Sequence, residues 1–167
     1  MIDLKRLVTL LLFACVLSLS AVTYADTTYW RGDHRFPMVW MHHGIGWYLD
    51  TTSIYFNRID SNHCSIAVST IRVKDADLGN NTMSGTGTFY IYYDEANTQM
   101  YECNSTMSNR RYLKPTGSNA ESGCPMYVGE AAYYVSQGKK FYGAYTWKDD
   151  YLNKYIDIFS DDFYANL

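Results

Sequence analysis

Residues 46–56 read Gly46-Trp47-Tyr48-Leu49-Asp50-Thr51-Thr52-Ser53-Ile54-Tyr55-Phe56, and they constrain the architecture of this 167-residue chain more than any other segment. Trp47 and Leu49 share one face of an extended backbone. Ile54 and Phe56 also share a face, but the step from 49 to 54 is odd, so one unbroken strand does not direct all four to the same core. The small polar residues between them favour a turn. We therefore expect two short strands joined by a bulge or tight bend, which fold the sheet over its core.

Segments on both sides of this one have the alternation and the turn residues that are typical of antiparallel strands. One strand is expected over 38–42, and the two glycines that follow it allow a hairpin turn. The longest run, 63–74, is apolar on both faces, which predicts a covered central strand. Further strands over 86–93, 98–103 and 109–113 complete a meander.

The apolar period changes from two to 3.6 after these strands. Four apolar residues lie at positions i, i+3, i+4 and i+7 of one helical stripe: Val128, Ala131, Ala132 and Val135. We expect a helix from Pro125 to Gln137, ended by Gly138 and lying flat on the sheet because two alanines allow close approach. The fold class predicted is α+β, with a curled antiparallel β-meander sheet and one helix packed on it, after an N-terminal signal helix.

Residues 1–25 have the features of a secretory signal peptide, since basic residues precede an apolar run and small residues precede the cleavage position. Cleavage between Ala25 and Asp26 leaves a single secreted α+β domain, 26–167. The expected location is secreted, periplasmic or in the cell envelope. Two alternatives stay open. One is a membrane anchor, for which the apolar run is short, and the other is a lipoprotein acylated at Cys15.

The charge of the chain narrows the class of partners. The formal net charge is −3 at pH 7, so no basic surplus attracts a phosphate backbone or an anionic membrane. We expect no nucleic-acid partner and no stable membrane span after processing, and the sequence does not determine the oligomeric state. The segment from Asp26 to Pro37 lacks a clear period and is expected to pack late or not at all.

Three cysteines remain after the predicted cleavage, and export permits a disulfide. Cys64 and Cys103 belong to expected strands that a third strand separates by about 9.5 Å, too far for a bridge. Cys103 ends a strand and Cys124 precedes the helix, with a polar loop between them. We therefore predict a Cys103–Cys124 disulfide that pins the helix to the sheet, with Cys64 a buried free thiol. The alternative is that all three stay reduced.

The sequence contains no HExxH, CxxC, GxSxG, phosphate-loop or GxGxxG motif. His42 and His43 are adjacent, so on a strand they point to opposite faces and do not share a metal ion. His63 and Cys64 are arranged in the same way. We expect no catalytic, cofactor-binding or metal-binding residues, and no cofactor.

Two short patterns resemble known exported proteins. Trp40, then Gly46 to Asp50 with Ser53-Ile54, resembles the opening W…YxD…SI pattern of surface-adhesin protein E-like domains, which are small exported bacterial proteins. This resemblance covers residues 40–56 and implies an antiparallel sheet packed with helices, no catalysis, and binding of host matrix or serum proteins. Gly129 to Ala132 and Lys140 to Gly143 resemble a recurring ending in uncharacterised exported proteins of anaerobic bacteria.

Seventeen tyrosines are an excess for a chain of this length. Tyrosine has an apolar ring and a polar hydroxyl, so it suits half-buried sheets and binding surfaces alike. The leading hypothesis is a non-catalytic exported adhesion or binding module for a protein or a glycan. One alternative is a small secreted enzyme with a cleft beside the helix, holding His42 or His63 near a buried acid. The other is a structural envelope subunit with a bare sheet edge.

Overall fold

The computed structural model describes residues 27–167. Its strands are β1 (Met38–His42), β2 (Ile45–Leu49), β3 (Tyr55–Arg58), β4 (His63–Val73), β5 (Met83–Asp94), β6 (Gln99–Cys103), β7 (Arg111–Tyr112), β8 (Thr146–Asp149) and β9 (Lys154–Asp157). Its helices are α2 (Gly123–Gln137) and α3 (Asp161–Ala165), with the 3₁₀ turns η1 (Trp30–Gly32), η2 (Thr51–Ser53), η3 (Ala76–Leu78) and η4 (Tyr142–Ala144). The predicted signal peptide, and its cleavage site between Ala25 and Asp26, lie outside the described residues.

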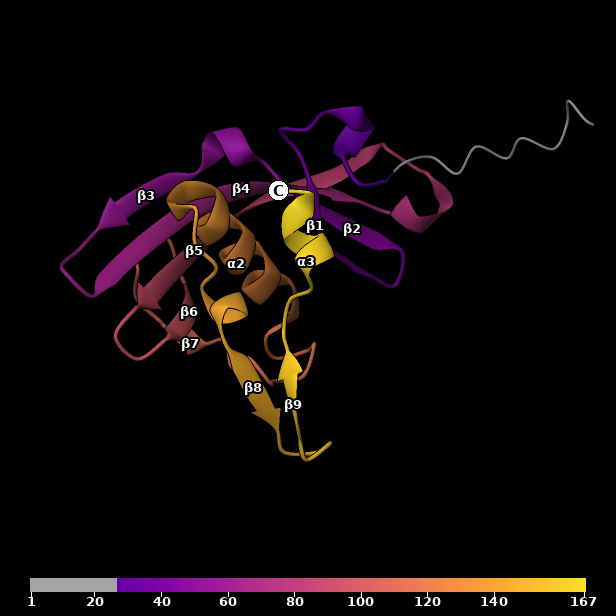
Figure 1. Ribbon diagram of the computed structural model, residues 1–167. Coiled ribbons are helices and arrows are strands. Elements are labelled where there is room, and N and C mark those ends of the chain that lie inside the picture. The colour runs from indigo at the N-terminus through magenta and orange to yellow at the C-terminus, as the bar shows by residue number, and fades with distance from the viewer. Residues whose placement is uncertain (1–26) are drawn as a thin grey trace, which may run out of the picture.

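Strands β1 to β7 form one antiparallel sheet that curls around α2 (Figure 1). Its order is β1-β2-β4-β5-β6-β7, and β3 also pairs with β4. The long strand β4 is central because it pairs with β2, β3 and β5. The predicted fold class, α+β with a curled antiparallel sheet and one main helix packed on it, is confirmed for this part of the chain.

The segment 46–56 forms a corner beside the central strand. Strand β2 pairs with residues 70–73 of β4, and β3 pairs with residues 64–67 of the same strand. Between them the chain makes the turn η2, where Oδ1 of Asp50 accepts hydrogen bonds from the backbone N–H and the hydroxyl of Thr52, at 3.0 and 2.6 Å. The aspartate therefore closes the turn. The prediction of two short strands joined by a tight bend is confirmed.

Helix α2 covers the inner face of the sheet (Figure 1). Val128, Ala131 and Ala132 are fully buried there, as the apolar stripe predicted. Val135, the last member of the stripe, is 36% exposed and lies at the margin of the contact. The helix ends before Gly138, whose φ of 65° is easiest for glycine, so the predicted end of the helix is confirmed.

A second, smaller core lies on the outer face of the sheet, over β2 and β4. Tyr48 and Ile71 are buried in it, and Trp30 and Phe36 pack against them. The segment before β1 was expected to pack late or not at all, and this expectation is wrong for its described part. The side chains of Trp30 and Phe36 supply an apolar contact with the sheet. The sequence did not predict this contact because the segment has no regular spacing of apolar residues.

The C-terminal segment returns across α2 as η4, the β8–β9 hairpin and α3 (Figure 1). The hairpin projects beyond the sheet, whereas Phe159 and Tyr164 are buried in the inner core. Oγ of Ser160 accepts the N–H of Phe163 at 3.3 Å and caps α3. Among residues 27–167, no helix has both the length and the apolar character needed to cross a bilayer.

The three cysteines of residues 27–167 are free thiols. Cys64 is fully buried, as predicted. The predicted Cys103–Cys124 bridge is not formed, because the sheet separates the two residues. Met100 of β6 faces α2, since a Cβ on Gly129 would contact its sulfur. Side chains alternate along a strand, so Cys103 points to the outer face, whereas Cys124 lies in α2 on the inner side.

Candidate functional site

The outer face of the sheet carries several tyrosines on the half that β3, β5, β6 and β7 form. Along β5, Ile91 and Tyr93 belong to the inner core beneath α2. Since successive side chains of a strand point to opposite faces, Tyr90 and Tyr92 point outward. The same alternation is visible in the sequence, where aliphatic and aromatic residues at 89, 91 and 93 alternate with these two tyrosines.

Strand register brings the outward tyrosines into a row. Tyr92 pairs with Tyr101 of β6, and Tyr101 pairs with Tyr112 of β7. The ring centroids of these two pairs are 6.1 and 5.4 Å apart. His63 of β4 stacks against Tyr92 from the other side, at 5.6 Å. The row therefore crosses four adjacent strands, a width of about 14 Å at the usual strand spacing.

Two further residues extend the row. Tyr55 of β3 lies opposite Ala67 of β4 and is 68% exposed. The guanidinium carbon of Arg110 lies 3.4 Å from the centroid of the Tyr92 ring, in a cation–π contact. We call this set the tyrosine face, and its members are Tyr55, Tyr90, Tyr92, Tyr101, Tyr112 and Arg110. It offers aromatic rings, phenol hydroxyls and one cation, which suit stacking and hydrogen bonding to a partner.

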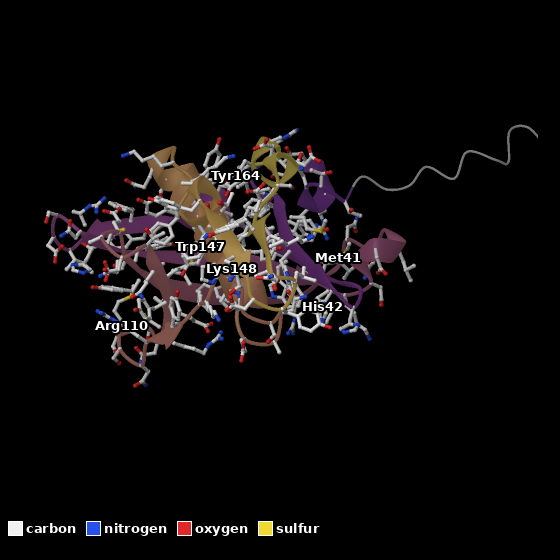
Figure 2. All side chains as sticks on the ribbon, turned by 60° about the horizontal axis from the view of Figure 1, so that its bottom comes forward. Met41, His42, Arg110, Trp147, Lys148 and Tyr164 are labelled. Carbon is white, nitrogen blue, oxygen red and sulfur yellow. The ribbon has the colours of Figure 1, made fainter. Side chains whose placement is uncertain are left out.

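The two histidines of the enzyme hypothesis do not lie beside a buried acid. Nδ1 of His63 lies 2.8 Å from Oδ2 of Asp60, whose side chain is 52% exposed, and Nε2 of His63 lies 3.9 Å from Oδ1 of Asp94, whose side chain is 15% exposed and so not fully buried. His42 stacks on Trp40 with ring centroids 5.2 Å apart. Figure 2 shows His42 at the opposite end of the molecule from Arg110. Within residues 27–167, no group of three or more His, Cys, Asp or Glu side chains is placed to hold a metal ion.

A cleft of about 180 Å³ lies beside the end of α2, between Glu95, Tyr133 and Lys140. Glu95 accepts hydrogen bonds from Nη1 of Arg58 at 2.5 Å and from the hydroxyl of Tyr133 at 2.6 Å. Burial acts to raise the pKa of Glu95, but these two hydrogen bonds outweigh it, and the pKa is lowered below its ordinary value. The carboxylate is thus held ionised and paired with Arg58, as is typical of a structural ion pair.

Glu130 of α2 is fully buried and forms the other carboxylate cluster beside the helix. Its oxygens accept hydrogen bonds from the backbone N–H groups of Phe141, Tyr142 and Gly143, at 2.8, 2.8 and 3.3 Å. The hydroxyl of Tyr164 donates a fourth, at 2.7 Å. The three N–H groups lie at the start of η4, where such groups lack acceptors within their own turn. Glu130 therefore supplies from α2 the acceptors that η4 needs.

This contact joins the two motifs noted in the sequence, 129–132 and 140–143. Both of their glycines lie where the backbone is closely approached. The hydroxyl of Tyr93 donates to the carbonyl of Gly129 at 2.9 Å, and the hydroxyl of Tyr164 occupies the position that a Cβ on Gly143 would take. The two motifs thus have a structural role in holding the C-terminal segment on α2. Helical periodicity alone did not indicate that Glu130 is buried.

No family model, curated protein or solved structure matches this chain. The resemblance of residues 40–56 to surface-adhesin protein E-like domains stays a prediction. The sequence predicted no catalytic, cofactor or metal residues, and its candidates, Cys103 and Cys124, do not come together. The excess of tyrosines suggested a binding surface, but the sequence did not locate it. The row of tyrosines depends on the register of four strands, which the sequence does not reveal.

Proposed function

We propose that this chain is a non-catalytic exported binding module that holds a protein or a glycan on the tyrosine face. The observation that carries the proposal is the row of register-aligned tyrosine rings on a sheet face that α2 does not cover. Tyrosine is enriched among the residues that contribute most to recognition, because its rigid ring presents a large contact area at a small entropic cost. The export predicted from residues 1–25 supports a partner outside the cytoplasm.

The chemistry of the tyrosine face supports non-covalent binding. Its exposed members, Tyr55 and Tyr112, are 68% and 40% exposed, so their rings are accessible to a partner. Tyr92, which lies on β5 between the strands of these two residues, is 8% exposed. The guanidinium of Arg110 and the ring of His63 cover it. The face therefore has a rigid centre with accessible rings on either side, an arrangement that limits the entropy lost on binding.

The test is a double variant, Tyr55→Ser with Tyr112→Ser, applied to immobilised extracellular-matrix proteins and to a glycan array. We expect the variant to lose at least tenfold in affinity for at least one protein or glycan that the unmodified chain binds, with an unchanged melting temperature. Tyr151→Ser is the matched control, because Tyr151 is 96% exposed at the tip of the β8–β9 hairpin and outside the face. Retained binding of every partner in the double variant, or equal loss in the control, would contradict the proposal.

A second function, that of a structural subunit, is favoured by the edge of β5. Strand β6 pairs with residues 90–94 of β5, and no described strand pairs with that side of residues 83–89. A free edge offers N–H and C=O groups to a strand of another chain. Self-association that persists in the Tyr55→Ser and Tyr112→Ser double variant, when that variant binds neither proteins nor glycans, would favour this function over the first.

A further inference from the structure

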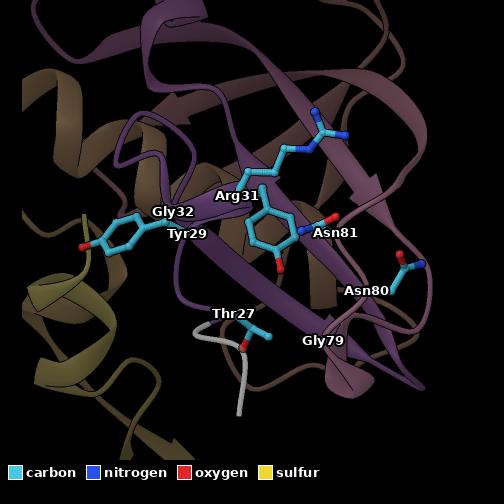
Figure 3. A pocket seen from close by; sticks show the side chains of 8 residues that line it. Thr27, Tyr29, Arg31, Gly32, Gly79, Asn80 and Asn81 are labelled. Carbon is cyan, nitrogen blue, oxygen red and sulfur yellow. The ribbon is translucent and has the colours of Figure 1, made fainter. Parts of the chain in front are cut away.

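A separate cavity lies on the outer face, away from the tyrosine face, and its volume is about 420 Å³ (Figure 3). Its walls come from three segments: residues 27–32 before β1, Tyr48 of β2, and residues 79–81 after η3. The volume is within the range of small-molecule sites, about 300–1,000 Å³. The indole Nε1 of Trp30 donates to the carbonyl of Asn81 at 2.8 Å and so ties two of these segments together.

Polar groups of the cavity wall lack partners in the described part of the chain. Tyr48 is 2% exposed and lines the cavity, and no described residue forms a hydrogen bond with its hydroxyl. Because the hydroxyl oxygen is not itself sealed from solvent, it is accessible to a ligand through the cavity that Tyr48 lines. The guanidinium of Arg31 forms no ion pair within residues 27–167, and the side-chain amide of Asn81 forms no hydrogen bond there.

Arg31 is held in place although its backbone is strained. Its φ is 56°, in the left-handed region that residues other than glycine rarely adopt. Its guanidinium carbon lies 4.7 Å from the centroid of the Trp30 ring, a contact that orients the side chain. Strain of this kind gathers at ligand sites, because the neighbouring structure maintains it where a side chain must be positioned.

The lining groups indicate the chemistry of the ligand. Arg31 is the one cationic lining residue, and no Asp or Glu lines the cavity. Guanidinium pairs with carboxylate through two parallel hydrogen bonds. The other side-chain donors and acceptors are hydroxyls and amides, including those of Tyr48 and Asn81, which match the hydroxyls of a sugar ring.

We propose that this cavity binds a carboxylate-bearing pyranose, either as a free sugar or as the terminal residue of a glycan. Arg31 pairs with the carboxylate, and the hydroxyl of Tyr48 and the amide of Asn81 bind ring hydroxyls. This proposal does not rest on the tyrosine face, because none of these residues belongs to it.

Calorimetric titration of the full chain with glucuronic acid and with N-acetylneuraminic acid tests the proposal, with glucose as the neutral probe. We expect at least one acid to bind with a dissociation constant below about 1 mM, which corresponds to a binding free energy of about −4 kcal/mol. We also expect it to bind at least tenfold more tightly than glucose. Sialyllactose, which ends in N-acetylneuraminic acid, distinguishes the two sources. If it binds, the site accepts a glycan terminus, and if only the free acid binds, the site takes the free sugar.

Two variants assign the contacts. Arg31→Gln is expected to lose at least tenfold in affinity, whereas Arg35→Gln is the matched control, because Arg35 lies in the same segment but pairs with Asp33 outside the cavity. Tyr48→Phe is expected to weaken binding severalfold while the melting temperature stays the same or rises, since it removes a hydroxyl without a partner.

Failure of both acids to bind, equal binding of glucose, or unchanged affinity in Arg31→Gln would overturn the proposal. A fall in the melting temperature of Tyr48→Phe with no change in affinity would overturn the role of Tyr48.

Discussion

The carboxylate of Glu130 is a case in which one residue links two segments. It is buried without a cationic partner in the described part of the chain, and its four hydrogen-bond donors are neutral. Four donors replace the water that a carboxylate loses on burial. Removing the carboxylate would leave three backbone N–H groups of η4 without acceptors, and each unsatisfied buried group costs about 1–3 kcal/mol.

Glu130→Gln is therefore expected to lower the free energy of unfolding by about 3 kcal/mol or more, because an amide NH₂ would face an N–H donor. Urea unfolding followed by tryptophan fluorescence measures the change. Glu121→Gln, at an exposed glutamate just before α2, is the matched control and is expected to stay within about 0.5 kcal/mol. A Glu130→Gln variant as stable as the control would show that the contact does not hold the C-terminal segment.

The pH dependence of this loss follows from the pKa of Glu130. Burial raises that pKa above its ordinary value of 4.5, although the four hydrogen bonds act to lower it. The folded state thus binds the proton more tightly, so this contribution to stability is fully present below about pH 4.5 and is lost as the pH rises through the folded-state pKa. The cost of Glu130→Gln should accordingly be larger at pH 4 than at pH 7.5. If the loss of unfolding free energy in Glu130→Gln instead grew with pH, the pKa of Glu130 would be lowered on folding rather than raised.

The position of a residue on an element decides whether it can meet another, and β6 illustrates this. Met100 faces α2, so the outward position of Cys103 follows from strand alternation. Chain proximity had indicated a bridge between Cys103 and Cys124. The faces of the sheet, which the linear order of the residues does not reveal, prevent it.

Thiol labelling of the folded protein under non-reducing conditions should therefore modify Cys103, which is half-buried, and spare Cys64 and Cys124 until urea is added. Burial raises the pKa of Cys64 to about 12 and raises that of Cys124 further above its ordinary value, so both thiols are protonated as well as inaccessible. Peptide mapping by mass spectrometry identifies the modified residues. Recovery of a disulfide-linked peptide that contains Cys103 and Cys124 would contradict the structure.

At the scale of the whole molecule, the sheet uses its two faces differently. The inner face is closed by α2 and by the C-terminal segment, and the outer face is divided between the segment before β1 and the tyrosine face. The tyrosines accordingly occupy two environments, since Tyr93 and Tyr142 are fully buried while Tyr55 and Tyr151 are mainly exposed.

A chain that ends after Gly138 is expected not to unfold cooperatively. It would lack four buried aromatic residues, Phe141, Tyr142, Phe159 and Tyr164. Removing one buried aromatic side chain costs about 3–5 kcal/mol, so the loss of four costs about 12–20 kcal/mol, which is comparable to or larger than the usual total stability of about 5–15 kcal/mol. Urea unfolding with Tyr151→Ser as the control measures this. A sharp transition in the shortened chain would show that the sheet and α2 suffice.

The sequence by itself determined the strands of the curled sheet, the corner at Asp50, and the main helix with its end at Gly138, but not the β8–β9 hairpin. These depend on steric preferences and hydrogen bonds among residues that are close along the chain, and such interactions leave a local period or a turn residue behind. Only the tertiary structure decided the acceptor role of Glu130, the separation of Cys103 from Cys124 and the gathering of the outward tyrosines. Those outcomes depend on which segments, distant in sequence, pack against each other and in which register, and no local pattern records that choice.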